Sequence, residues 1–372
     1  MKSIRSISRR SLLSVFVAAQ LVTACATQPV AQFSAPESQT RIDKPLTIVA
    51  VGDTMMDGTA RPEFKKFGYD YPFVHVGKFI ERADIAIANL EGPLTKRGSI
   101  DVEKKYVFRS PPDKVASALA KTGFDVFSLA NNHTLDYGVQ GLTDTIDALN
   151  RHGLAYSGAG MDLASARKPV VIERKGKRVA FLAYSLTFPE EFWAKKNQPG
   201  TAFGHEAHVR KDVANAKKEA DIVIVSFHWG REGTTELRPY QTALGRAAID
   251  EGAAAVVGHH PHILQGIERY KHGVILYSLG NFVFGSYSYR AKRAAIAELV
   301  FDGNLVKTVR MIPINVFNPE VVFQPQVLTG EKAAEVINEL STLSQPLGVA
   351  VGNDKDIAII GENTQDVSLL AQ

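Results

Sequence analysis

The stretch Ser128-Leu129-Ala130-Asn131-Asn132-His133-Thr134-Leu135-Asp136-Tyr137-Gly138 marks a change of local structure near the middle of the chain. The apolar run that leads into it, residues 125–130, predicts a short buried strand. After it, apolar residues return with helical spacing at Val139, Leu142, Ile146 and Leu149. The polar cluster is therefore expected on a strand-to-helix loop, at the edge where α/β sheets bind ligands. The residues alone leave a second interpretation open, in which the cluster is an Asn-rich turn with a helix cap.

Polar residues of the same kinds follow other apolar runs. Further strands are expected at 46–51, 84–90, 221–227 and 253–257, and the polar residues at their ends are Asp53, Glu91, His228, and His260 with His262. One histidine at a strand end is usually structural. Together with Asn132 and His133 after the central strand, however, there are five such strand ends, which indicates that their side chains converge on one site. Buried polar groups cost free energy unless they are paired, and a bound cation removes that cost. Oxygen and nitrogen donors without thiolate suit one or two divalent metal ions such as Zn, Mn, Fe or Mg.

The His260-Pro261-His262 motif has its own geometric expectation. Alternate residues of an extended strand share a face, so a straight strand end would point both imidazoles to one side.

The remaining pattern is that of an α/β protein. Helices are expected at 111–121, 209–220, 239–252 and 331–344, and further strands at 274–279, on both sides of a turn at 302–304, and at 356–360. Two apolar segments flank Lys175-Gly176-Lys177, which predicts a hairpin and a sheet that is not purely parallel. Residues 188–205 form a long polar and aromatic loop, which suits either a lid over a substrate or a plain insertion.

The composition is that of an exported globular chain with no nucleic-acid partner. Of the 372 residues, 45% are hydrophobic and 22% are charged, and the net charge is +4. Without the four basic residues of 1–24, the chain has 39 basic against 39 acidic residues, so no basic stripe remains for nucleic acid. Residues 1–24 combine a basic start with an apolar stretch at 12–22, which predicts a secretory signal peptide.

The only cysteine of the chain, Cys25, follows that leader directly. The sequence Leu21-Val22-Thr23-Ala24-Cys25 resembles a bacterial lipobox, which predicts a lipid on Cys25 and an exported, membrane-anchored lipoprotein of the bacterial cell envelope. Residues 25–45 would then form a flexible tether. The alternative is an incidental cysteine beside a cleaved leader. Residues 8–13 resemble a twin-arginine signal, although an ordinary basic leader explains them as well.

Six motifs together carry a wider resemblance: Gly52-Asp53, Asn89-Leu90-Glu91-Gly92, residues 130–138, His228-Trp229-Gly230-Arg231-Glu232, Gly258-His259-His260-Pro261-His262 and Tyr277-Ser278-Leu279-Gly280-Asn281-Phe282. They resemble the CapA family, the poly-γ-glutamate capsule synthesis proteins, within the calcineurin-like metallophosphoesterase superfamily. The resemblance covers residues 47–317 and implies a four-layer αββα sandwich, with two mixed sheets face to face and helices outside. We therefore expect a domain at 46–318 and a C-terminal extension, 319–372, packed on it.

The resemblance also implies roles for individual residues. The implied metal ligands are Asp53, Glu91, Asn132, His228, His260 and His262. Met55 stands where the superfamily pattern has a further histidine, so one ligand of a full two-metal site is missing. His133 resembles the histidine that protonates a leaving group. Asp136 would orient His133 through its ring N–H, and it also suits a helix N-cap.

Other residues are candidates for binding a substrate. Arg109, in the family-like segment Phe108-Arg109-Ser110-Pro111-Pro112, could face an anionic substrate or be an ordinary surface arginine. The remaining candidates are Asn131, Glu232, His259 and Asn281, of which His259 also suits a place behind the metal ligands. The family often has an acid after Gly-Asn-Phe-x-Phe, where this chain has Gly285.

Two functions follow as hypotheses. The first is a metal-dependent hydrolase or transferase that acts on a polyanionic envelope polymer such as poly-γ-glutamate, or on a small anionic substrate. The second is a non-catalytic polymer-binding subunit, partnered with membrane synthase and export subunits, which the missing histidine at Met55 favours. A third hypothesis, a secreted broad phosphoesterase, fits the altered first motif less well.

Overall fold

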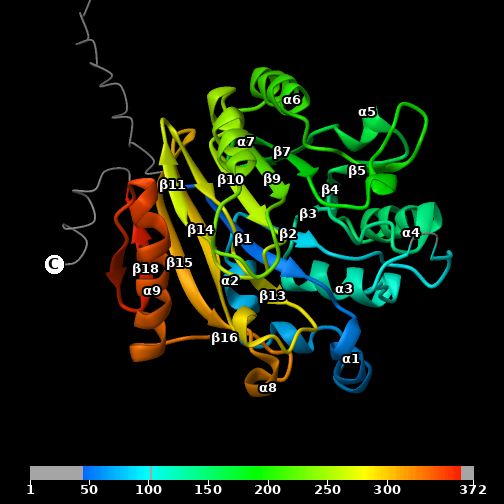
Figure 1. Cartoon of the computed structure of the whole chain (residues 1–372), viewed down its shortest axis with the longest axis horizontal. Helices are drawn as coiled ribbons and strands as arrows, with labels where there is room; N and C mark the ends of the chain where they lie inside the picture. The colour runs from blue at the N-terminus through cyan, green and yellow to red at the C-terminus, as the bar shows by residue number, and fades with distance from the viewer. Residues whose placement is uncertain (1–44, 101–102, 362–372) are drawn as a thin grey trace, which may run out of the picture. The chain divides into compact units, whose positions relative to one another are not determined.

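The computed structural model describes residues 45–100 and 103–361 (Figure 1). The predicted signal peptide, the lipidation site at Cys25 and residues 26–44 of the predicted tether lie outside these residues. Within the described part of the chain, the strands form a ten-stranded sheet, a six-stranded sheet and a two-stranded pair. No helix of this part is both long enough and apolar enough to cross a bilayer.

The larger sheet runs in the order β17-β18-β15-β14-β1-β2-β3-β4, with β13 paired to β1 and β16 to β15. Its parallel strands β1 to β4 are Thr47–Thr54, Ile85–Leu90, Val126–Ser128 and Ala155–Ser157. The other strands, β13 to β18, are Asn281–Val283, Arg293–Asp302, Leu305–Asn315, Gln326–Val327, Gly352–Asp354 and Ile357–Ile360. β2 is buried along its whole length, which explains why its sequence is apolar on both faces.

The smaller sheet runs in the order β11-β12-β10-β9-β7-β6. Strands β6, β7, β9, β10, β11 and β12 are Val170–Arg174, Lys177–Ser185, Ile222–His228, Ala255–His259, Ile267–Tyr270 and Gly273–Leu276. β6 and β7 are antiparallel, so the hairpin predicted around Gly176 is confirmed. The short strands β5 and β8, Ala159–Gly160 and Gly200–Thr201, pair with each other.

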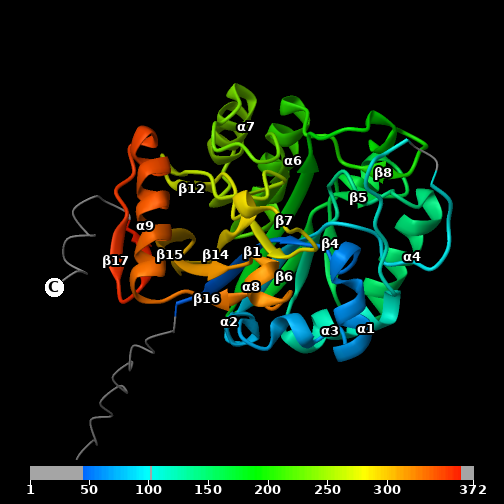
Figure 2. The same cartoon turned by 60° about the horizontal axis from the view of Figure 1, so that its bottom comes forward.

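Two packed sheets with helices on both outer faces make up four layers (Figure 2). Helices α1 to α4, at Arg61–Phe67, Gly77–Glu81, Pro112–Thr122 and Gly138–Arg151, cover the larger sheet. Helices α6 and α7, at Glu206–Glu219 and Pro239–Asp250, cover the smaller one. Ile48 and Ile87 of the larger sheet share one buried core with Phe181 and Ile224 of the smaller sheet. The expected four-layer αββα sandwich is confirmed.

The chain beyond residue 318 adds strands to the larger sheet. Helices α5, α8 and α9 are Leu163–Ala166, Asn318–Val321 and Gly330–Ser344. β18 pairs with β15 through Ile360 and Val309, and α9 buries Val336 and Leu340 in the core between the sheets. The helix expected at 331–344 and the strand expected at 356–360 are therefore both present.

Candidate metal centre

The candidate ligands gather where strands of the two sheets end. Asp53 lies near the end of β1, Glu91 directly follows β2, and His228 is the last residue of β9. All three side chains are fully buried. His260 and His262 follow β10, the neighbour of β9 in the smaller sheet. The structure thus brings together the strand ends that the sequence singled out.

Two glycines allow the close approach of chain segments under this cluster. A Cβ atom at Gly52 would lie 1.9 Å from the carbonyl oxygen of Gly280, and one at Gly258 would lie 1.9 Å from that of Tyr277. Only glycine fits at these two positions. The N–H of Asp53 can consequently donate to the carbonyl oxygen of Gly280 at 3.0 Å, which fixes the end of β1.

Glu91 lies at the centre of the cluster. Its Oε1 is 3.8 Å from Nε2 of His228 and 3.7 Å from Nε2 of His262. Ligand atoms of Asp53, Glu91 and His228 lie within 4.8 Å of one another, and so do those of Glu91, His260 and His262. Because both groups share Glu91, the cluster could hold one or two cations.

Two atoms of the cluster lack a partner in the ion-free protein. Oε1 of Glu91 and Nδ1 of His260 are buried and have no hydrogen-bond partner among the described residues. A buried polar atom left in this state costs roughly 1–3 kcal/mol. A divalent cation would satisfy such atoms, and carboxylate oxygens with imidazole nitrogens are suitable ligands. The residues present therefore fit a metal ion.

The charges in the cluster depend on one another. Burial raises the pKa of Glu91 well above its usual range, and the charge of Asp53 adds to this. Burial would also raise the pKa of Asp53, but contacts with His259 and His262 outweigh it and hold that pKa well below its usual range. Burial would lower the pKa of His262, but the charges of Glu91 and Asp53 raise it to about 10. The raised pKa values of Glu91 and His262 mean that a cation binding here would compete with a proton.

The chain turns sharply after β10. His260 and His262 have φ angles of +94° and +60°, in the left-handed region that is costly for residues other than glycine. Both imidazoles do reach one group of candidate ligands with Glu91, as expected, but a straight strand end is not what brings them there. Two left-handed residues around Pro261 place the rings instead, with their centroids 6.0 Å apart. Backbone strain of this kind is concentrated at functional sites.

Two amides support the cluster. Nδ2 of Asn89 donates to Oδ1 of Asp53 at 2.8 Å and to Oε2 of Glu91 at 3.2 Å. Asn89 was not among the candidates from the sequence, although an amide inside the apolar run 84–90 was the available signal. Oδ1 of Asn132, a predicted ligand, lies 2.8 Å from Nε2 of His228. The structure thus places Asn132 against the cluster.

A buried histidine and acid lie next to Asn132. Nδ1 of His133 is 2.7 Å from Oδ2 of Asp136, which also accepts the N–H of Phe108 at 2.8 Å. Because an ionised carboxylate only accepts, Nδ1 carries the proton and Nε2 is left to exchange one with a ligand. Burial lowers the pKa of His133, and the contact with Asp136 opposes this. The first turn of α4 has no side-chain cap, so the helix-cap interpretation of Asp136 is wrong.

Lys104 holds this pair in place. Its Nζ lies 2.5 Å from Oδ1 of Asp136, and it also donates to the backbone oxygen of Asn132. The side chain is only 13% exposed, and Nζ lies 5.2 Å from the ring centroid of Phe192 in the loop 188–205. Nothing in the sequence distinguishes this buried lysine from its neighbour Lys105, so it was not predicted. Whether the loop acts as a lid stays a prediction.

Comparison with known proteins agrees with these features. Residues 47–286 match the model of the family described as "Bacterial capsule synthesis protein PGA_cap". This chain belongs to that family. The "Capsule biosynthesis protein CapA" of Bacillus anthracis is 36% identical over 282 residues, which cover 74% of this chain and 69% of that protein. The "PGA biosynthesis protein CapA" of Bacillus subtilis (strain 168) is 33% identical over 307 residues, 82% of this chain and 80% of that protein.

A solved structure is also similar, at a lower level. The NAD nucleotidase of Haemophilus influenzae has a TM-score of 0.42 at 11% identity, covering 80% of this chain and 56% of that one. At this level the likeness carries no argument about function.

In this member of the PGA_cap family, the motif that begins at Gly52-Asp53 offers no nitrogen ligand, because Met55 stands at the position of the histidine. Met55 is buried, and its Sδ accepts the N–H of Asp57 at 3.2 Å. The carboxylate of Asp57 pairs with Arg61 at 2.5 Å and accepts the N–H of Arg109 at 2.8 Å. The second acid of this loop is therefore engaged outside the cluster.

Three candidate substrate-binding residues are engaged within the protein. Asn131 donates to Oδ1 of Asn89 and accepts the N–H of His133 at 3.0 Å. Oδ1 of Asn281 lies 3.0 Å from Nδ1 of His262. His259 is 3% exposed, with Nδ1 3.5 Å from Oδ1 of Asp53. These positions suit support of the cluster, and contact with a substrate stays a prediction for all three.

The other two candidates face solvent. Arg109 is exposed and stacks its guanidinium over the ring of Tyr137 at 4.5 Å. Glu232 is exposed, and its charge raises the pKa of both Glu91 and His262. Both side chains are therefore open to a ligand, and Glu232 also acts on the cluster through its charge.

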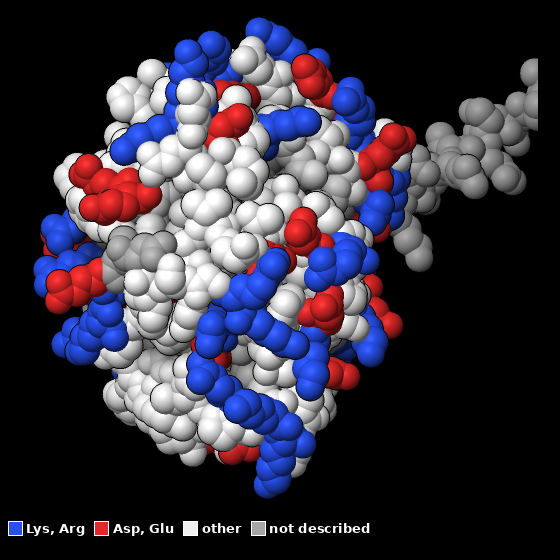
Figure 3. All heavy atoms as spheres, turned by 90° about the vertical axis from the view of Figure 1, so that its right-hand side faces the viewer, with Lys and Arg blue, Asp and Glu red and all other residues white. Residues whose placement is uncertain are grey.

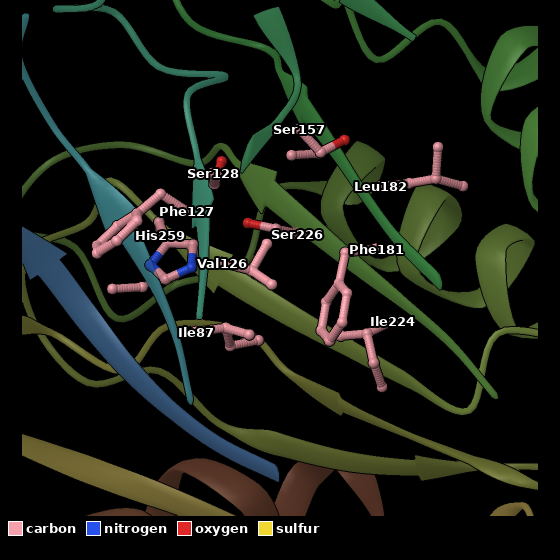
Figure 4. Close-up of a pocket in the computed structure, with 12 residues that line it drawn as sticks. Ile87, Val126, Phe127, Ser128, Ser157, Phe181, Leu182, Ile224, Ser226 and His259 are labelled. Atoms are coloured by element: carbon pink, nitrogen blue, oxygen red, sulfur yellow. The ribbon is translucent and has the colours of Figure 1, made fainter. Parts of the chain in front are cut away.

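A small cavity lies behind His259, between the two sheets (Figure 4). Its volume is about 20 Å³, and its lining includes Ser128, Ser157, Ser226 and His259. Nδ1 of His259 and the hydroxyls of Ser128 and Ser226 have no hydrogen-bond partner among the described residues. A space of this size and polarity suits one water molecule. His259 therefore faces this interior cavity as well as Asp53.

Proposed function

We propose that this chain is a metal-dependent hydrolase or transferase that acts in the synthesis, export or processing of a polyanionic capsule polymer resembling poly-γ-glutamate. It would work at the cell envelope, anchored by a lipid on Cys25. The observation that carries the catalytic part is Glu91, which is shared between two ligand groups and has an unpartnered oxygen. The polymer class is supported by family membership and by the printed names of the two CapA relatives.

The residues of the cluster would divide the work between binding and proton transfer. The metal would be held by Asp53, Glu91, Asn132, His228, His260 and His262. When bound, it would polarise an acyl or phosphoryl oxygen and lower the pKa of a water molecule. Asp136 fixes the tautomer of His133, so that Nε2 can carry a proton to the leaving group. The ammonium of Lys104 offsets the buried charge of Asp136.

The alternative function is a non-catalytic subunit that binds the polymer during assembly or export. Met55 favours it, because a thioether replaces a nitrogen ligand in the first motif. The two functions differ in what His133 does. If the protein is an enzyme, replacing His133 should lower turnover and leave polymer binding unchanged. If it is a binding subunit, there is no turnover that the replacement could lower.

The test is a turnover assay with γ-linked glutamate oligomers and phosphoesters, with Mn, Zn, Fe or Mg added. We expect His133→Ala to lower turnover by roughly 10²–10⁴-fold with the metal content unchanged. Metal-loaded protein that binds the oligomer without turnover would establish the alternative. Metal-loaded protein that neither binds nor cleaves any of these compounds would contradict both proposals.

A further inference from the structure

We propose a second anion-binding site, a basic groove on the outer face of α1 and α3 that holds the carboxylates of a polyanionic chain. The inference rests on the proposed function, because it names where a polymer would lie outside the metal centre. The groove is defined by two adjoining hollows. Their shared lining residues are Lys65, Tyr69, Lys96 and Pro111.

The hollows have room for an extended chain. The larger one has a volume of about 590 Å³ and lies between α1, α3 along its length and the segment at residue 96. The smaller one has a volume of about 330 Å³ and is lined by Arg61, Arg109 and Ser110 besides the shared residues. Because the two hollows share residues, they form one continuous depression.

The groove carries an excess of unpaired positive charge. Its four lysines, Lys65, Lys96, Lys114 and Lys121, are exposed, and none has a hydrogen bond or ion pair with another described residue. Lys114 and Lys121 lie seven residues apart, on one face of α3. Of the three acids in the lining, Asp57 pairs with Arg61 at 2.5 Å and Asp113 pairs with Arg151 at 2.8 Å, which leaves Asp70 against four lysines.

The excess is local. Outside residues 1–24 the chain has as many acidic as basic residues, so a cluster of unpaired lysines is not a consequence of the overall charge. Figure 3 shows the side of the molecule on which α1 and α4 lie, and Lys and Arg side chains run from the centre of this face to its lower edge. A polyanion near this face would be attracted and concentrated.

One segment connects the groove to the metal centre. Phe108 packs against His133, with ring centroids 4.8 Å apart. The three residues that follow it, 109–111, line the hollows. The near end of the groove therefore begins at Arg109, the residue next in the chain to the one that packs against His133. A polymer held in the groove could therefore extend to the metal centre, where a unit beyond the bound ones would lie.

The ligand chemistry is a polycarboxylate rather than a single anion. Each exposed lysine contributes little alone, so the affinity comes from several carboxylates bound at once. Binding should weaken as the salt concentration rises, and it should not need the metal.

The test measures binding of a fluorescent γ-linked glutamate oligomer to the purified protein in chelator, over a range of salt concentrations. The groove variant replaces four lysines, as Lys65→Gln, Lys96→Gln, Lys114→Gln and Lys121→Gln. The control variant replaces four exposed lysines that line neither hollow, as Lys168→Gln, Lys211→Gln, Lys332→Gln and Lys355→Gln. We expect the groove variant to bind at least about tenfold more weakly than the parent, and the control to bind like the parent.

Unchanged binding in the groove variant, or equal losses in both variants, would overturn the proposal. Tighter binding of inorganic polyphosphate than of the γ-linked oligomer would overturn the assignment to a polycarboxylate. A short substrate separates this test from that of the proposed function. If the groove variant keeps metal-dependent turnover of a short substrate while its polymer binding is unchanged, the groove fails and the proposed function stands.

Discussion

Oε1 of Glu91 lies 3.8 Å from Nε2 of His228, and this pair joins the two sheets at the ends of β2 and β9. Both side chains are fully buried, and the glutamate oxygen has no hydrogen-bond partner in the described residues. An oxygen in this position destabilises the ion-free fold and stabilises a bound cation. The cluster thus suits a metal ion, and the unpaired oxygen would cost stability without one.

Glu91→Gln tests this arrangement directly. Gln has nearly the same shape but no charge to bury, so the ion-free variant should be at least as stable as the parent. The parent should gain about 2.7 kcal/mol at a metal concentration of 100 Kd, and the variant should lose this gain. Chemical denaturation with and without metal measures both effects.

Glu298→Gln is the matched control for that experiment. Glu298 is a buried acid of β14 that pairs with Arg82 at 2.9 Å and Arg310 at 3.0 Å, outside the cluster. Its loss should lower the stability of the ion-free protein and leave the metal effect intact. A metal effect that survives Glu91→Gln would exclude Glu91 as a ligand.

Lys104→Met should destabilise the protein. Removing one partner of a buried ion pair leaves the charge of Asp136 with only the hydrogen bonds from His133 and Phe108, at a cost of up to roughly 3–5 kcal/mol. The neighbouring variant Lys105→Met changes an exposed side chain and should stay within roughly 0.5 kcal/mol of the parent. Denaturation curves compare the stability of the parent and the two variants. Similar curves for the two variants would show that Lys104 does not stabilise the protein through Asp136.

Gly258→Ala should damage the base of the metal centre. The added methyl group would meet the carbonyl oxygen of Tyr277 at 1.9 Å, and overpacking of this kind typically costs roughly 1–3 kcal/mol. At Gly77 in α2 the nearest atoms would be 3.7 Å away, so Gly77→Ala should be neutral or slightly stabilising. Unfolding measurements compare the two, and a harmless Gly258→Ala would show that the strands can separate there.

Much of the cluster was predictable because buried strands leave a clear pattern in the sequence. Asp53, Glu91 and His228 each end an apolar run, and parallel strands carry their ends to one edge of a sheet. The helix at 138–151 followed from its spacing in the same way. Such features depend only on neighbours in the chain.

Other features depend on contacts that no local pattern contains. The strand expected at 125–130 stops at Ser128, because the N–H of Asn131 turns back to the carbonyl oxygen of Leu129. Strands of three residues, such as β4 and β13, are too short for any periodicity. Lys104 becomes a buried partner of Asp136 only through the tertiary fold.

The most direct measurement is the metal content of the purified protein, prepared without chelator, beside a His260→Ala/His262→Ala variant. With Glu91, the two histidines form one of the two groups of candidate ligands. The control, His75→Ala/His272→Ala, removes two exposed histidines outside the cluster. We predict one or two divalent ions per chain in the parent and the control, and a loss of metal from the His260/His262 variant. A parent that stays metal-free after incubation with Mn, Zn, Fe and Mg would contradict the account.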